Sequence, residues 1–151
     1  MTQRLDINTF KTVVAHTPLI SLDLIVENSQ RKVLLGQRLN RPAQGCWFVP
    51  GGRIRKGEKI ADAFSRLTKE ELGVELALVE AEFIGPYEHL YSDNFSGESF
   101  STHYVVLGYR ISLDLNLSDL PKEQHGNYRW ADVNDLLECG DVHHHTKLYF
   151  L

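Results

Sequence analysis

Acidic residues beside a pair of glycines form the densest group of side chains in this sequence that could do chemistry. Gly51-Gly52 precedes a segment with helical periodicity over 58–72, and Gly73 stands where glycine commonly ends a helix. At about 100° per residue, Glu71 lies about 20° from Ile60, inside the apolar stripe of this segment. The stripe consists of Ile60, Ala63, Phe64, Leu67 and Val74. Because a carboxylate facing a sheet is costly unless it is paired or metal-bound, Glu71 is predicted to have one of these two roles.

Three other charged residues of this segment allow two interpretations. Glu58 lies near the start of the predicted helix, where a carboxylate interacts favourably with the helix dipole. Arg66 precedes Glu70 by one helical turn, so the two could form an ion pair. Since exposed acidic residues are common, Glu58 and Glu70 could equally be surface residues, and their role at a metal stays open.

Strands and helices must bring such residues together from the rest of the chain. Periodicity and turn signals predict helices at 6–16, 58–72 and 132–137, and strands at 19–27, 32–39, 47–49, 78–91, 100–113 and 128–130. The first two strands are predicted to form a hairpin, and Pro50-Gly51-Gly52 is predicted to end the third. Strands wrapped by helices indicate an α/β domain with a mixed sheet.

Composition restricts the class of protein. A chain of 151 residues, 42% of them hydrophobic and 24% charged, fits one domain over 1–151. The formal net charge of −4 disfavours a nucleic-acid partner. Cys46 and Cys139 lack CxxC spacing and indicate reduced thiols. Neither a membrane-spanning run nor a signal-peptide core is evident, so we expect a cytoplasmic protein with no membrane partner.

The spacing of the glycines and glutamates resembles a known motif. Gly52-x5-Glu58-x7-Arg66-Leu67-Thr68-x-Glu70-Glu71-x-Gly73-Val74 is similar to the Nudix box, a loop–helix–loop that holds a divalent metal against a diphosphate. The family pattern has a glutamate where this chain has Leu67. A box that keeps its glycines and lacks that glutamate resembles the GDP-mannose mannosyl hydrolases, a divergent Nudix branch. Further similar segments cover nearly the whole chain: 17–19, 40–45, 47–53, 93–97, 102–108 and 123–125.

This resemblance implies a Nudix fold, an α/β/α sandwich around a mixed β-sheet. It also implies hydrolysis of GDP-mannose to GDP and mannose by attack of water on the anomeric carbon, with the choice between mannose and glucose left open. The implied metal is Mg²⁺, with Mn²⁺ as a substitute, and its implied ligands are the Gly51 carbonyl, Glu71 and Gln124. The implied partners are a small nucleotide sugar and a second copy of the chain in a homodimer.

The resemblance assigns His125 as the general base, and its ordinary pKa near 6.5 leaves a neutral nitrogen at cellular pH. His125 and Gln124 are both predicted to lie in a loop. Arg38, Arg53 and Arg66 are candidates for the diphosphate because guanidinium groups match phosphate geometry. Arg66 could equally be a structural partner of Glu70.

Three more residues are assigned near the phosphates and the sugar. Tyr104 is a candidate hydrogen-bond donor to phosphate. Asp23 alternates within an apolar strand, and the resemblance gives it, with His125 and Arg38, a catalytic role near the sugar or leaving group. As an alternative, an inward Asp23 could bond backbone amides. His89 could contact the sugar or be a satisfied strand histidine, and His143-His144-His145 is predicted to be a solvated segment.

Two other functions remain open at this stage. The first is a nucleoside-diphosphate-sugar pyrophosphohydrolase that attacks phosphorus, against which Leu67 argues. The second is a catalytically inactive regulator that binds a nucleotide sugar. A candidate base at His125 argues against this second function, because a sensor needs none.

Overall fold

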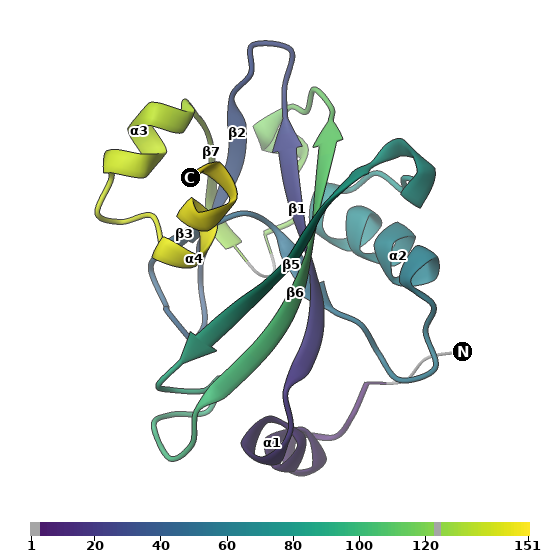
Figure 1. The fold of residues 1–151 in the computed structure, drawn as a ribbon, viewed down its shortest axis with the longest axis vertical. Helices are drawn as coiled ribbons and strands as arrows, with labels where there is room; N and C mark the ends of the chain where they lie inside the picture. Colours follow the sequence, from purple (N-terminus) through teal and green to yellow (C-terminus); the bar gives the residue numbers. More distant parts are fainter. Residues whose placement is uncertain (1–3, 123–124) are drawn as a thin grey trace.

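The computed structural model describes residues 4–122 and 125–151 (Figure 1). Its helices are α1 (Ile7–His16), α2 (Ile60–Leu72), α3 (Val133–Glu138) and α4 (His144–Lys147), with 3-10 turns η1 (Leu78–Glu80), η2 (Leu117–Asp119) and η3 (Leu148–Phe150). Its strands are β1 (Leu19–Glu27), β2 (Val33–Arg38), β3 (Trp47–Phe48), β4 (Gly51–Arg53), β5 (Glu82–Tyr91), β6 (Thr102–Ser112) and β7 (His125–Ala131). No helix in the described ranges is long and apolar enough to span a membrane.

The strands form one mixed sheet. Its main path runs β3-β2-β1-β6-β5, with β4 added to β1 and β7 added to β2. Strands β1 and β6 are parallel over a nine-residue register that begins at Leu19↔Tyr104, whereas the other pairs are antiparallel. The predicted hairpin is present at Glu27↔Val33, but farther along β1 the partners are β4 and β6.

The alternation of β1 separates two cores. Leu22, Leu24 and Val26 pack with Phe64 of α2 on one face of the sheet, whereas Ile25 packs on the other. The second core contains residues from α3 and the C-terminal turn, including Leu136 and Tyr149. Figure 1 shows α2 on one side and α3 and α4 on the other. The predicted α/β/α sandwich around a mixed sheet is therefore confirmed.

The elements differ from the sequence expectations in several places. Strand β3 ends at Phe48, before Pro50, as predicted, but Gly51 and Gly52 then belong to a further strand, β4, which pairs with β1 at Leu22↔Gly52. In α2, the apolar stripe is shorter than predicted, because Ile60 is 42% exposed and Val74 lies beyond the last helical residue. The last strand begins at His125 instead of Tyr128.

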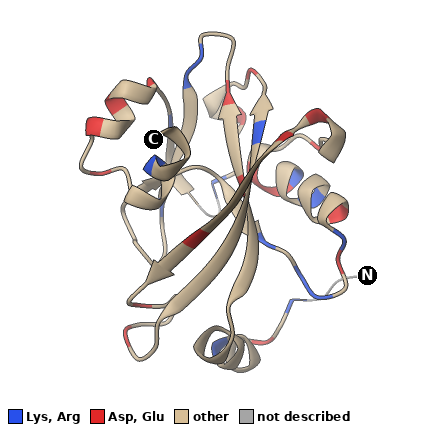
Figure 2. Ribbon diagram, in the orientation of Figure 1, with Lys and Arg blue, Asp and Glu red and all other residues tan. Residues whose placement is uncertain are grey.

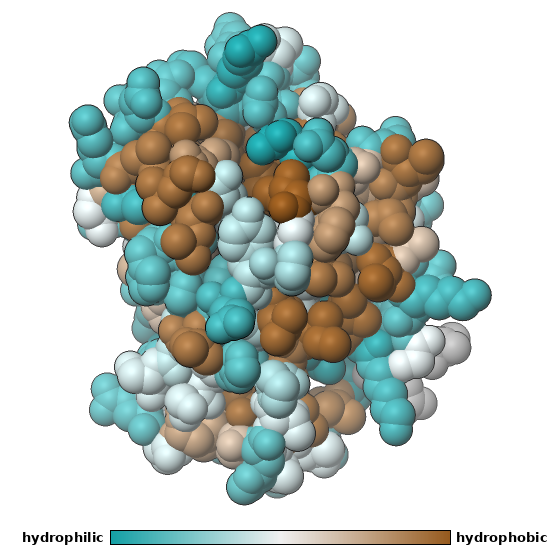
Figure 3. Space-filling view, viewed as in Figure 1, coloured by the Kyte–Doolittle hydropathy of each residue, from teal (hydrophilic) through white to brown (hydrophobic). Residues whose placement is uncertain are grey.

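Charge and hydropathy are unevenly distributed over the surface. Acidic and basic residues are interspersed on the ribbon, and both signs occur on α2 (Figure 2). Figure 3 shows apolar side chains gathered on the face that carries the C-terminal turns and β5. Exposed apolar residues of these elements include Phe83, Leu90 and Leu148. Buried residues nevertheless form both cores, so these exposed side chains lie outside the packed interior.

Candidate active site

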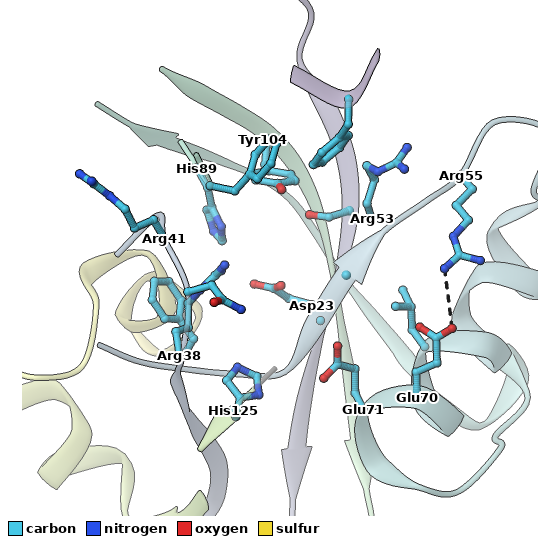
Figure 4. A pocket seen from close by; sticks show the side chains of 18 of the residues that line it. Asp23, Arg38, Arg41, Arg53, Arg55, Glu70, Glu71, His89, Tyr104 and His125 are labelled. Carbon is cyan, nitrogen blue, oxygen red and sulfur yellow. Dashed lines mark ion pairs between the residues drawn. The ribbon is translucent and has the colours of Figure 1, made fainter. Parts of the chain in front are cut away.

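A cavity of about 810 Å³ opens where β1, β2, β4 and α2 meet. Every candidate site residue in the described ranges lines it: Asp23, Arg38, Gly51, Arg53, Arg66, Glu71, His89, Tyr104 and His125. Gln124 lies outside the described residues. The sheet thus brings together side chains that are up to a hundred positions apart in the sequence (Figure 4).

The two adjacent glutamates of α2 have different surroundings. Glu71 is 6% exposed and points into the cavity, while Glu70 points towards Arg55 at its edge (Figure 4). Glu70 is 3.1 Å from Nη1 of Arg66 and 3.8 Å from Nη2 of Arg55. Adjacent residues of a helix point about 100° apart, and for this reason Glu71 faces the cavity while Glu70 lies at its edge.

Neighbouring atoms approach the paired glycines so closely that no side chain would fit at either position. A Cβ on Gly51 would lie 2.3 Å from the Leu22 carbonyl oxygen and 2.5 Å from Oδ1 of Asp23. A Cβ on Gly52 would lie 2.4 Å from Cδ2 of Leu67, which is 2% exposed. Leu67 of α2 therefore packs directly against Gly52 of β4.

The donors beside β4 fit a hard divalent cation. Glu71 supplies a buried carboxylate, and Gly51, which offers a backbone carbonyl, lines the same cavity. Oxygen ligands of this kind suit Mg²⁺, which also retains waters and substrate phosphates. The chemistry of the donor set therefore agrees with the metal that the resemblance implied.

His125 lies on β7, not in a loop, and is 6% exposed. In the register of the sheet it lies opposite Arg38, and a Cβ on Gly36 would approach its Cγ to 2.6 Å. Burial, with a smaller contribution from Arg38, lowers the pKa of His125 to about 4. Its buried Nδ1 has no hydrogen-bond partner among the described residues. The imidazole is therefore neutral at cellular pH and keeps hydrogen-bonding capacity in the cavity wall.

The arginines fall into two groups. Among the described residues, neither Arg38 nor Arg53 forms an ion pair, and burial lowers the pKa of Arg53. Arg66, in contrast, donates to Glu58 at 2.7 Å, to Glu70 at 3.1 Å and to the Arg53 carbonyl at 2.9 Å. These bonds support the structural alternative for Arg66, which links α2 to β4. Arg38 and Arg53 retain guanidinium groups for an anion.

Asp23, His89 and Tyr104 all line the cavity, and Asp23 lies beside Gly51 of β4 (Figure 4). Asp23 accepts a hydrogen bond from the Tyr149 hydroxyl, so the expected alternative of a bond to backbone amides is not what the structure contains. Burial raises the pKa of Asp23 to about 7, opposed by Tyr149 and Arg38. Burial also raises the pKa of Tyr104 and keeps its hydroxyl protonated. The cavity thus contains the Tyr104 hydroxyl as a hydrogen-bond donor and an Asp23 carboxyl group that can be protonated or ionised near neutral pH.

Several lining residues were missed by the sequence analysis. Phe10 and Phe95 pack with ring centroids 4.9 Å apart, and Arg53 lies 5.2 Å above the Phe10 ring. Phe48 and Tyr91 form another aromatic part of the wall, 6.4 Å apart. In a sequence, an aromatic residue is normally interpreted as part of the hydrophobic core. Only the tertiary structure shows that these four side chains line the cavity instead.

The three consecutive histidines differ from the solvated segment that was predicted. His144 is exposed, but His145 is buried at 5% and stacks on His89 with centroids 4.5 Å apart. His143 stacks on Phe48 and accepts a hydrogen bond from the His145 amide. These histidines support the wall of the cavity from behind.

Sequence comparison identifies relatives with the same domain. The NUDIX domain model matches residues 17–150. The low-salt glycan biosynthesis protein Agl8 of Haloferax volcanii is 38% identical over 113 residues, which span 75% of this chain and 70% of that protein. An uncharacterized Nudix hydrolase of Bacillus subtilis, YvcI, is 26% identical over 116 residues, 74% of this chain and 68% of that protein.

Solved structures share the architecture. The MutT protein from Methanosarcina mazei Go1 has a TM-score of 0.67 at 18% identity, covering 89% of this chain and 92% of that one. The NUDIX domain of Shewanella oneidensis NrtR, solved with ADP ribose, has a TM-score of 0.64 at 21% identity and covers 96% of this chain and 89% of that one. At these identities the likeness concerns the fold. Together with the domain match, it establishes that this chain belongs to the Nudix hydrolase family.

Proposed function

We propose that this enzyme hydrolyses GDP-mannose, or a closely similar GDP-sugar, to GDP and the free sugar by attack of water on the anomeric carbon. One observation carries the proposal. The position at which the Nudix box usually has a glutamate is Leu67, buried at 2% against Gly52, so a carboxylate for delivering water to phosphorus is missing there. A neutral His125 lines the same cavity and offers a different base.

The division of the cavity supports a nucleotide sugar as substrate. The rings of Phe10 and Phe95, with Arg53 over Phe10, offer apolar aromatic faces and a cation, which suit a nucleobase. Arg38 and Arg53 have no carboxylate partner among the described residues and suit the diphosphate. Asp23 and His89, which line the same cavity, suit the hydroxyl groups of a sugar.

In this proposal His125 takes the proton of the attacking water. Its depressed pKa leaves it neutral, and an anionic substrate nearby would raise that pKa towards the pH of the reaction. Arg38 and Arg53 stabilise the charge that develops on the departing diphosphate. Mg²⁺, or Mn²⁺ in its place, would be held by the Gly51 carbonyl, Glu71 and Gln124 and supplies further positive charge at the diphosphate when bound.

The relatives add limited support. A protein named for glycan biosynthesis is 38% identical to this chain, and glycan assembly consumes activated sugars. We extend the proposal to a single Nudix domain over 1–151 that works as a cytoplasmic homodimer. The dimer can be checked by light scattering of the purified chain, for which a monomer mass would contradict it.

Product analysis in ¹⁸O-water tests the reaction. Purified enzyme, Mg²⁺ and GDP-mannose should give GDP and mannose, with the label in mannose. Release of GMP and mannose 1-phosphate would instead support a pyrophosphohydrolase, and binding without turnover would support a regulator. Because a single displacement inverts the anomeric centre, proton NMR should detect β-mannose first. Label in GDP would overturn the proposed attack on carbon.

A further inference from the structure

Tyr149 lies behind the wall of the cavity, in the C-terminal turn η3. It is 7% exposed, and its hydroxyl donates to Oδ2 of Asp23 at 2.5 Å. The same hydroxyl oxygen lies 3.4 Å from Nε2 of His89. Asp23 and His89 line the cavity, whereas Tyr149 is not among the described residues that do. Tyr149 therefore touches two candidate substrate-contacting side chains without facing the substrate itself.

A missing side chain on the strand between them makes this contact possible. Strand β6 separates β1 from β5, and its Gly108 pairs with Asp23. A Cβ on Gly108 would lie 3.2 Å from Cε1 of Tyr149 and 3.0 Å from Cγ1 of Ile84. Contacts this short would force the ring to shift. Glycine thus lets the Tyr149 ring approach β6 closely enough for its hydroxyl to reach residues of both flanking strands.

The ring is fixed from a second side as well. Tyr87 packs edge-on against Tyr149 with centroids 4.5 Å apart and planes at 71°. His89 is fixed in turn by His145, whose ring stacks on it and whose Nε2 is 3.1 Å from the Leu90 carbonyl. Edge-to-face and stacked aromatic contacts of this kind restrict ring rotation.

The hydrogen-bond directions follow from the donors available. Burial and the neighbouring Asp23 raise the pKa of Tyr149, so the phenol keeps its proton. That single proton is donated to Asp23, which leaves the phenol oxygen as an acceptor for an N–H of His89. A neutral His89 with its proton on Nε2 has its lone pair on Nδ1. The chain of contacts therefore selects one of two histidine tautomers.

We propose that Tyr149 is a positioning residue that holds Asp23 and His89 in one arrangement in the cavity wall and fixes His89 as its Nε2–H tautomer. The kinetic consequence rests on the proposed function, whereas the tautomer does not. Without the hydroxyl, the Asp23 carboxylate loses a hydrogen bond and can rotate away from its position. Misplacement of a group at a reacting centre lowers turnover more than it lowers binding of the remote nucleotide.

Tyr149→Phe removes the hydroxyl and keeps the ring, and Tyr87→Phe is the matched control. Tyr87 loses a hydroxyl from the same wall, but its hydroxyl bonds neither Asp23 nor His89 in the structure. We expect kcat for GDP-mannose to fall about 10- to 100-fold in Tyr149→Phe. The KM, and the Kd for GDP measured by calorimetry, should stay close to wild-type values. Tyr87→Phe should retain both constants, and an unchanged kcat in Tyr149→Phe would overturn the kinetic role.

Imidazole ¹⁵N NMR tests the tautomer directly. His89 is assigned by the loss of its signals in His89→Asn, and wild type should show the Nε2–H form. Tyr149→Phe should show a mixture of forms, and a wild-type spectrum in that variant would overturn the proposal. If wild type does not hydrolyse GDP-mannose, the proposed function fails, but this spectrum still decides the role of Tyr149.

Gly108→Ala provides a second perturbation should Tyr149→Phe fold poorly. The added Cβ meets the Tyr149 ring at 3.2 Å and should displace the hydroxyl from Asp23. Its effect on kcat should therefore disappear in the Tyr149→Phe background, because both changes remove the same contact. Equal effects of Gly108→Ala in both backgrounds would contradict the proposal.

Discussion

Leu67→Glu restores the usual residue of the Nudix box and tests both packing and chemistry. Leu67 is 2% exposed and belongs to the core of α2, so the change gives up about 2 kcal/mol of apolar burial. It also places a carboxylate one helical turn from Glu71, and like charges at this spacing repel. Burying an incompletely paired charge brings the expected loss to about 3–5 kcal/mol.

For a chain of this size, each kcal/mol lowers the melting temperature by about 2–4 °C. Calorimetry in EDTA should therefore place Leu67→Glu at least about 6 °C below wild type. Leu67→Gln has nearly the same shape without charge, so the difference between the two variants isolates the carboxylate. Leu67→Met keeps the volume and should cost less than about 1.5 kcal/mol.

Because Leu67 also lines the cavity, Mg²⁺ should recover more stability in Leu67→Glu than in Leu67→Gln, since the new carboxylate lies beside the metal donors. We expect GDP and mannose, at a reduced rate, to remain the products. A wild-type melting temperature in EDTA would refute the packing argument. We expect the rest of the site to keep directing water to the anomeric carbon even when this glutamate is restored. Release of GMP would refute that expectation.

The remaining predictions concern single side chains of the cavity. Glu71→Gln should lower kcat by orders of magnitude and weaken Mg²⁺ activation in a titration. Glu70→Gln, which alters only the ion pairs with Arg55 and Arg66 at the edge, should have a much smaller effect, and equal losses would remove the distinction between them. His125→Gln should lower kcat by roughly 10²–10⁴ while the Kd for GDP stays unchanged, and an equal loss of GDP affinity would show that the imidazole contributes to binding. The pKa of Asp23, raised from 3.8 to about 7 by burial, means that wild type loses stability as the pH rises from the first value towards the second. Relative to wild type, metal-free Asp23→Asn should therefore be more stable at pH 8 than at pH 5, by at most about 3 kcal/mol, and an equal difference between the two proteins at both pH values would contradict this.

The sequence was informative where a local rule decides the structure. The end of α2 at Gly73 follows from glycine in the left-handed region, at φ 76°. The cavity position of Glu71 follows from helical angle alone, although Ile60 at the end of the predicted stripe is exposed. Such features need only neighbours within one or two helical turns, which the sequence contains.

Features that depend on long-range pairing were not predictable. Gly51-Gly52 indicates a turn in the sequence, and only the presence of β1 alongside makes it strand β4. Tyr149 and His145 lie in turns too short for periodicity, so nothing in the sequence connects them to Asp23 or His89. The placement of His125 in a strand likewise required the register with Arg38.

The parallel pairing of β1 with β6 has a consequence for synthesis of the chain. Leu19 pairs with Tyr104, so β1 emerges from the ribosome well before its long partner exists. At about 5–20 residues per second, this interval lasts roughly 4–17 seconds. During it Leu22, Leu24 and Ile25, all fully buried in the finished protein, lack the strand that pairs with β1 along its whole length. Nascent chains that stop before β6 should therefore bind chaperones strongly, and release should coincide with the appearance of that strand.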